Sequence, residues 1–254
     1  MTAMATRPKK QVSVINACLL AGRILIENGS EMTRVIDTMQ RIAHNAGIDS
    51  AQMFVTVTGI VVSLDDTPNA QVTSIERRTI DLGKVARVNE LSREFAEQKL
   101  SLGMLIKRLQ RIDNDIHTFP FWIRLFAASL LSAVLLIVFT QDYIDAPTGF
   151  VIGGIGYSVF YFFNRQFKVQ FLSEFVASLT IGILAAIAVR VHLGVYIDNI
   201  IIGSIMPLVP GVPITNAVRD LVSGNLISGP ARAVEALLSS VAIGSAIVCV
   251  LHFV

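Results

Sequence analysis

Charged side chains are scarce in the second half of this 254-residue sequence. Of the 21 Lys and Arg, 16 lie in residues 1–124, and 13 of the 19 Asp and Glu lie before residue 118. The remaining 130 or so residues keep only five basic and six acidic side chains. Five or more amphipathic helices of a soluble protein would need more polar residues than this on their water-facing sides. We therefore expect the second half to lie in lipid, behind a charged first half.

Cysteine is also scarce, and several motifs that carry chemistry are missing. Cys18 and Cys249 are far apart and neither has a second ligand at metal spacing, so we expect no disulfide, no metal and no cofactor. No P-loop of the form G-x-x-x-x-G-K-[ST] occurs, so any pumping would use a gradient or a partner rather than bound ATP. No nucleophile and base stand at matching depth, so neither an enzyme nor catalytic residues are expected. The net charge of +2, without a basic stripe, argues against nucleic acid as a partner.

Residues 1–118 have the pattern of a cytosolic α+β domain. Apolar residues dominate 14–25, and Asn28-Gly29 is typical of a helix end because Gly accepts a positive φ. A second helix follows, with Ser30 as its expected N-cap. Apolar residues recur at steps of three and four over 32–46, which predicts an amphipathic helix against a soluble core.

Strands and two more helices complete this domain. Residues 52–64 and 72–75 are rich in Val, Thr, Ile and Phe and predict two or three short strands, with a turn at 65–69. Apolar residues at helical spacing over 85–95 and 102–112 predict two amphipathic helices. The expected element order is therefore ααβββαα.

Long apolar stretches begin after residue 118. They predict membrane spans at about 121–139, 148–163, 171–189, 195–221 (broken) and 231–254. The first apolar run starts about 120 residues along, so no cleavable signal peptide is expected. The expected fold class is a polytopic α-helical membrane protein with about five transmembrane helices, one of them broken, and an N-terminal soluble α+β domain. Its domains would be 1–118 and 119–254.

Basic residues predict the orientation in a bacterial cytoplasmic (inner) membrane. The positive-inside rule places the basic N-terminal domain, the 165–168 loop and the 219–232 segment in the cytosol, and the acidic 142–145 loop outside. Arg190 is the one charge that disagrees. With an odd number of spans, the N-terminus is expected in the cytosol and the C-terminus outside.

The most informative stretch is the Pro-rich segment 206–213. Three prolines in seven residues cannot sit in one continuous helix, because each removes a backbone donor and its ring clashes with the preceding turn. Counting ten residues inward from Val195 at ~1.5 Å each places the break near the bilayer centre. Carbonyls freed at that depth must be buried in protein or line a water-filled cavity, as in transporter sites built from discontinuous helices.

A half-helix restarting near Thr215 would offer free N–H groups and a positive partial charge to an anionic group of a solute. Thr215 and Arg219 would share one face, with Asn216 and Asp220 on the next. The predicted substrate-binding residues are Pro207, Pro210, Gly211, Thr215, Asn216, Arg219 and Asp220. The alternative is a simple helix kink, with Arg219 and Asp220 as a solvated pair at its cytosolic end.

Two carboxylates fall inside predicted spans. Glu174 lies early in the third span and Asp198 at the start of the fourth, and an ionisable group in a span is a functional hypothesis by default. Both are candidates for substrate or proton coupling, although both also lie near predicted membrane interfaces. Closely spaced glycines at 149–156 instead favour close helix packing.

The sequence resembles the threonine/serine exporter family (ThrE-like), and within it the shorter, YjjP-type half of a split two-component exporter. The resemblance covers essentially the whole chain, and the Pro-rich segment is its most specific part. It rests on Gly22–Leu25 with Gly29, Thr33–Val35, Thr56–Gly59, Ile205–Gly211, Asn216–Leu221, Gly224–Leu226 and Ser228-Gly229.

The resemblance implies a subunit of a secondary-active exporter of small polar solutes, either threonine/serine-type amino acids or C4-dicarboxylates such as succinate. Long members look like two membrane halves in one chain, whereas this sequence ends after the first half. The expected partners are a second small membrane subunit (a YjjB-like half), membrane lipid, the small-molecule substrate and, as a further possibility, copies of the same chain. An alternative is a membrane-anchored adaptor or sensor whose soluble domain binds a cytosolic partner.

Overall fold

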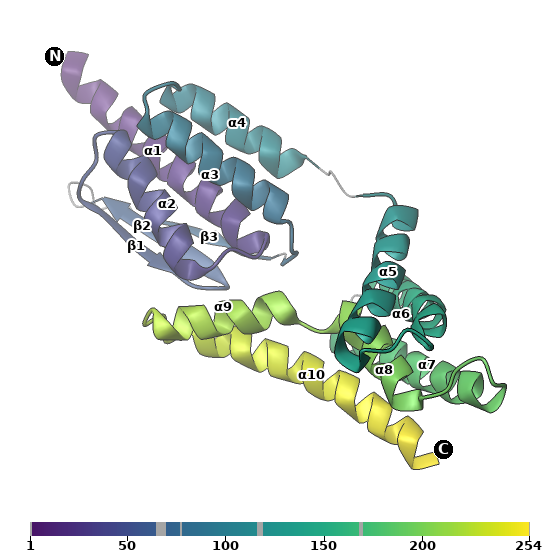
Figure 1. The fold of residues 1–254 in the computed structure, drawn as a ribbon. Helices are drawn as coiled ribbons and strands as arrows, with labels where there is room; N and C mark the ends of the chain where they lie inside the picture. The colour runs from purple at the N-terminus through teal and green to yellow at the C-terminus, as the bar shows by residue number, and fades with distance from the viewer. Residues whose placement is uncertain (1, 65–69, 77, 116–118, 168–169, 254) are drawn as a thin grey trace. The chain divides into compact units, whose positions relative to one another are not determined.

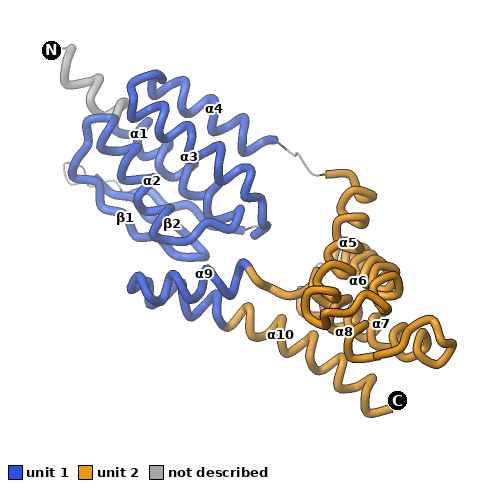
Figure 2. Tube along the Cα trace, viewed as in Figure 1, with its two compact units in different colours: residues 1–116, 212–233 blue, residues 117–211, 234–254 orange. Residues whose placement is uncertain are grey.

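The computed structural model describes residues 2–64, 70–76, 78–115, 119–167 and 170–253 (Figure 1). The turn expected at 65–69, Lys168 and the domain boundary expected at Thr118 lie outside the described residues. The chain divides into two compact units (Figure 2). Unit 1 comprises residues 1–116 and 212–233, and unit 2 comprises residues 117–211 and 234–254.

Unit 1 contains the expected ααβββαα series and, in addition, a segment from far along the chain. The series is α1 (Thr2–Glu27), α2 (Met32–Asn45), β1 (Ala51–Val55), β2 (Gly59–Leu64), β3 (Gln71–Ser74), α3 (Leu82–Ala96) and α4 (Leu102–Asn114). The later segment holds α9 (Gly211–Val222), apart from its first residue, and the first turn of α10 (Ser228–Phe253). Its sequence pattern alone groups this segment with the membrane spans.

The three strands form an antiparallel sheet in the order β1-β2-β3. Val55 pairs with Ile60, so Thr56–Thr58 form the tight connection, in which the Thr56 N–H donates to the Gly59 carbonyl at 2.9 Å. Alternate residues of β2 are buried and join the core of unit 1. The sheet therefore has the period-two pattern of a strand with one face on a core.

Helix α1 lies at the centre of unit 1 and contacts α2, α3, α4 and the sheet. Its buried residues cover more than one face, as expected of a helix surrounded by other elements; they include Val14, Ile15, Ala17, Cys18, Ala21, Ile24 and Leu25. A Cβ on Gly22 would lie 2.5 Å from Met39 Sδ and 2.9 Å from Ile60 Cδ1. The missing side chain thus lets α1 approach both α2 and β2.

The α1–α2 turn confirms one prediction and corrects another. Gly29 has φ +88°, the left-handed conformation expected at the end of a helix. Ser30 is not the N-cap of α2: Glu31 occupies that position, and no local side chain caps the helix. The Met32 N–H instead donates to Asp220 Oδ1 at 2.8 Å, so the cap comes from α9, 188 residues later.

Unit 2 is helical and apolar and confirms the predicted fold class. It contains α5 (Phe121–Thr140), α6 (Ala146–Phe167), α7 (Gln170–Arg190), α8 (Ile197–Ile205), η1 (Met206–Leu208) and most of α10. Among the described residues, four helices are long and apolar enough to span a membrane: 121–140, 146–167, 171–190 and 228–253. The pair 197–208 and 211–222 gives a fifth span if it is counted as one.

Small residues allow α5, α6 and α8 to pack closely within unit 2. A Cβ on Gly153 would lie 2.5 Å from Ser132 Cβ, and a Cβ on Gly203 would lie 2.6 Å from Leu136 Cβ and 2.9 Å from the Ser132 carbonyl oxygen. Approach of this kind is typical of membrane helices, where packing replaces the hydrophobic effect. The glycines at 149–156 therefore have the packing role that their spacing favours.

The α5–α6 and α7–α8 connections meet at one end of unit 2. Asp145 is buried there, and its two carboxylate oxygens accept hydrogen bonds from the backbone N–H groups of Val195 (2.7 Å) and Tyr196 (2.9 Å). Asp145 thus ties two connections that are 50 residues apart in sequence and stabilises the start of α8.

Candidate functional site

The Pro-rich segment breaks the fourth span, as the sequence predicts. Helix α8 passes into the single turn η1, Val209 is extended (φ −64°, ψ 128°), and the two halves are bent by 64°. Helix α9 restarts at Gly211 rather than near Thr215. The reason is that Pro213 lies in its first turn, where the missing N–H costs nothing because it would have no intrahelical partner.

Thr215 therefore sits inside α9 rather than at its amino end. Its hydroxyl donates to the Val212 carbonyl at 3.0 Å, and the side chain is exposed. Among the predicted pathway residues, Gly211 is also exposed, whereas Pro207 and Pro210 are half-buried. The structure thus brings Pro207, Pro210 and Gly211 together at the break and leaves Thr215 one turn farther along.

The other three predicted site residues contact the α1–α2 turn of unit 1. Asn216 Nδ2 donates to the Gly29 carbonyl at 2.8 Å. Arg219 Nη1 donates to Glu31 Oε2 at 2.9 Å. Asp220 Oδ1 accepts from the Met32 N–H, as described above. One helical face of α9 is therefore bound to the α1–α2 turn within unit 1; binding of a solute by these residues stays a prediction.

The beginning of α10 and the α9–α10 connection add two contacts to the same turn. Arg232 Nη2 donates to the Ser30 carbonyl at 2.8 Å, and its Nε lies 3.5 Å from Asp220 Oδ2. Asn225 Nδ2 lies 3.4 Å from Thr33 Oγ1. We call this set of contacts the junction: the turn residues 29–33 with Asn216, Arg219, Asp220, Asn225 and Arg232.

Burial distinguishes the charges of the junction. The side chains of Asp220 and Arg232 are 0% and 9% exposed, whereas that of Arg219 is 66% exposed. The alternative that Arg219 and Asp220 form a solvated pair is therefore wrong, because Asp220 is buried against Arg232 and the N-terminus of α2. A carboxylate at that position satisfies a free N–H and interacts favourably with the helix dipole.

The two coupling candidates differ in their surroundings within unit 2. Glu174 is buried on α7, next to the buried Ser173 and one turn before the buried Ser178. Asp198 is exposed in the first turn of α8. Ala177, close to Glu174 on α7, belongs to the same apolar cluster as Leu208 of η1. Glu174 is thus the buried one of the two carboxylates and Asp198 the exposed one, and a coupling role for either stays a prediction.

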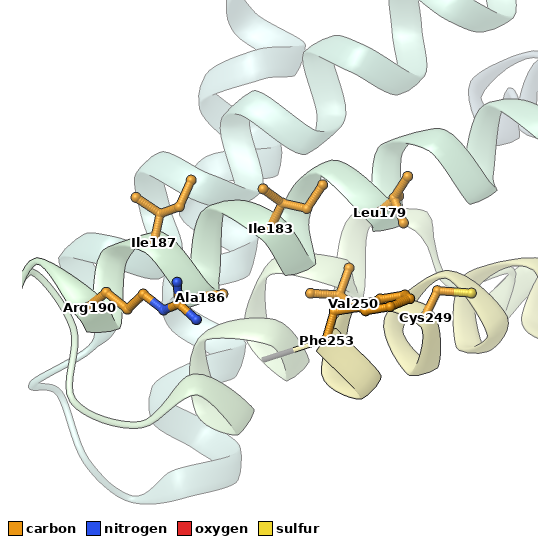
Figure 3. A pocket seen from close by; sticks show the side chains of 8 residues that line it. All are labelled: Leu179, Ile183, Ala186, Ile187, Arg190, Cys249, Val250 and Phe253. Carbon is orange, nitrogen blue, oxygen red and sulfur yellow. The ribbon is translucent and has the colours of Figure 1, made fainter.

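A pocket of about 380 Å³ lies between α7 and α10 in unit 2 (Figure 3). Its lining comprises Leu179, Ile183, Ala186, Ile187, Arg190, Cys249, Val250 and Phe253. Arg190 is the one charged residue in that lining and lies at one end of it. A polar solute needs several placed polar groups, so this apolar pocket does not fit such a solute.

With this geometry in place, comparison with known families decides the class of protein. The ThrE family model, described as "Putative threonine/serine exporter", matches residues 16–254. This chain belongs to that family. The ThrE match includes both units and the Pro-rich break, and with the apolar helices it makes the chain a membrane protein of a transporter family.

A curated relative supports the assignment to the ThrE family. It is the "Probable threonine/serine exporter" of Mycobacterium tuberculosis (strain ATCC 25618 / H37Rv), 20% identical over 228 residues. The alignment covers 88% of this chain and 43% of the relative, so the chain spans less than half of the relative's length. No solved structure matches the chain.

Sequence reasoning did not find the partners of α9 in this ThrE chain. Ser30, Glu31 and Arg232 belong to the junction, and no periodicity or local motif connects them to α9. A weak signal was available: Asp220 and Arg232 are two of the few charges in a stretch poor in charge. Charges retained there require partners, because an unpaired buried charge is costly.

Proposed function

We propose that this chain is a subunit of a secondary-active exporter of small polar solutes in the bacterial cytoplasmic membrane. The solutes would be threonine/serine-type amino acids or C4-dicarboxylates such as succinate. The observation that carries the proposal is the ThrE match over residues 16–254. The broken span supports it, because backbone carbonyls freed inside a membrane must be buried in protein or line a polar path.

The solute would pass the break, contacting Pro207, Pro210, Gly211 and Thr215. Amino acids and dicarboxylates share a carboxylate, and the amino end of the 12-residue helix α9 carries a positive partial charge. Thr215 is exposed one turn beyond that end and presents a hydroxyl to a polar solute. The prolines would hold the break open by preventing a continuous helix.

A proton gradient would drive the cycle through Glu174. A buried carboxylate in a span is costly and is therefore commonly tied to proton or ion movement. Glu174 is buried within α7, whereas Asp198 is exposed in the first turn of α8.

A second small membrane subunit of the YjjB-like type would complete the pathway. The alignment covers 43% of the curated relative, so more than half of that relative lies outside the matched part, which agrees with a pathway that needs a second half. The proposed orientation follows the basic residues, with the N-terminus in the cytosol and the C-terminus outside.

Flux through reconstituted vesicles tests this function. Proteoliposomes holding this chain and the partner should move labelled threonine, serine or succinate under an imposed pH gradient. Vesicles holding either protein alone should show no flux above empty vesicles. If none of the three solutes moves although a thermal unfolding assay shows that both proteins are folded, the exporter proposal is wrong. Failure of the two chains to co-purify would overturn the two-subunit form.

A further inference from the structure

Three backbone groups of the α1–α2 turn are bound by side chains from the end of the chain. The carbonyls of Gly29 and Ser30 accept hydrogen bonds from Asn216 and Arg232, and the Met32 N–H donates to Asp220. Helix α2 itself supplies no side-chain cap for its first amides. These three groups thus take their side-chain partners from α9 and α10, as buried backbone groups need partners, whereas the Gly29 and Ser30 N–H groups bond to carbonyls of α1.

The burial of the junction argues against direct contact between Asp220 and a solute. Its Oδ1 is used by the Met32 N–H, and its Oδ2 lies 3.5 Å from Arg232 Nε, with 0% of the side chain exposed. A donor group of a solute would have to displace an internal, charge-assisted contact to reach Asp220. The geometry instead gives Asp220 and Arg232 the task of holding two parts of the chain together.

Helix α9 begins directly at the break. The Gly211 N–H is bonded to the Val209 carbonyl at 2.8 Å, and Gly211 is itself the first residue of α9, so no linker separates the helix from the break. We propose that Asp220 and Arg232 are positioning residues: they fasten α9 to the α1–α2 turn and so fix the position of the amino-terminal part of α9, where Thr215 lies. This rests on the proposed exporter function for its effect on flux.

The proposal is tested by removing the contact between Asp220 and the Met32 N–H and then joining α9 to the α1–α2 turn again with a cross-link. In a background with Cys18→Ala and Cys249→Ser, Asp220→Ala should lower flux about tenfold, since small errors of position are costly at a site. Thr33→Cys with Asn225→Cys places two thiols where Thr33 Oγ1 and Asn225 Nδ2 lie 3.4 Å apart. A short, reducible bis-methanethiosulfonate should bridge them and restore most of the flux, and a reducing agent should remove the gain.

Two further variants serve as matched controls. The same cross-link with Asp220 intact should leave flux unchanged, because the junction stays closed in the working protein. Asp220→Asn keeps an oxygen that can accept from the Met32 N–H, so this variant should lose less flux than Asp220→Ala. If Asp220→Ala does not fold, the cross-linking experiment is done with Asp220→Asn instead. Complete cross-linking of Asp220→Ala without recovery of flux would overturn the proposal and favour a direct role for Asp220 on the solute.

A readout independent of transport separates this proposal from the exporter function. Hydrogen exchange at the first amides of α2, beginning with Met32, should speed up in Asp220→Ala and slow again on cross-linking. If hydrogen exchange at these α2 amides is the same in Asp220→Ala as in the unmodified protein, Asp220 does not hold the start of α2 and the proposal is overturned. If exchange speeds up in Asp220→Ala and slows again on cross-linking, but the unmodified protein transports none of the three solutes, the junction stands and the exporter function is overturned.

Discussion

Two arginines of the junction, Arg232 and Arg219, differ in burial, and we therefore expect their substitution to change stability by different amounts. Arg232→Met should lower the free energy of unfolding by about 3 kcal/mol, because it leaves the buried Asp220 without its charge partner. Arg219→Met should cost less than about 1 kcal/mol, because the Arg219 side chain is 66% exposed and water screens its attraction to the 18% exposed Glu31. Thermal or denaturant unfolding in detergent compares them, and equal losses would contradict the assignment of burial.

Cys18 gives a second prediction at this scale. Its thiol is buried in the core of unit 1, and this burial raises its pKa to about 12, so almost no thiolate exists near neutral pH. In a Cys249→Ser background, N-ethylmaleimide at pH 8 should leave the folded protein unmodified and add one adduct after denaturation. Thr33→Cys, at an exposed position of the same domain, is the control and should be modified while folded.

The contacts of Asp220 explain why the sequence predicted its place but not its partner. The i, i+4 spacing of Asn216 and Asp220 correctly put both on one face of a helix. Their partners are 187 and 188 residues away, and such distances leave no local pattern. For the same reason Ser30 was predicted as the N-cap of α2, because a serine before an apolar stripe is a typical local capping signal. The residue that binds the first amide of α2 is Asp220, which is distant in sequence.

At the scale of elements, helix packing in unit 2 depends on particular glycines. A Cβ on Gly203 would meet the Ser132 carbonyl at 2.9 Å, and this backbone oxygen cannot move without shifting α5. Gly203→Ala should therefore lower the melting temperature in detergent, in line with overpacking costs of about 1–3 kcal/mol. Gly244→Ala is the matched control, since a Cβ added there would have no atom within 4 Å; a similar drop in both would contradict close α5–α8 packing.

The existence of most elements followed from composition and period, but the first residue of one helix, α9, did not. Apolar runs and small residues predicted the spans, and three prolines predicted the break. The restart of α9 was misplaced because Pro213 was counted as a helix breaker, whereas a first-turn proline is tolerated. The grouping of residues 212–233 with unit 1 could not be predicted from the sequence either, because an amphipathic segment after a broken span has the same pattern as the rest of that span.

For the whole molecule, coupling to a gradient should depend on Glu174. Glu174→Gln removes the ionisable group from a buried position in α7 and should abolish flux driven by a pH gradient. Exchange of labelled for unlabelled solute, which needs no net proton movement, should persist. Asp198→Asn changes an exposed carboxylate and should keep both activities. Retained pH-driven flux in Glu174→Gln would exclude it as the coupling group.

The central claim is that the helix break faces the solute pathway, and thiol accessibility beside it is the most direct test. In the Cys18→Ala, Cys249→Ser background with the partner present, Thr215→Cys should react with a water-soluble methanethiosulfonate. The transported solute should slow that reaction. Val222→Cys, 84% exposed at the far end of α9, should react equally fast with and without solute. Reaction at Thr215→Cys that is insensitive to every solute the protein transports would contradict a pathway at the break.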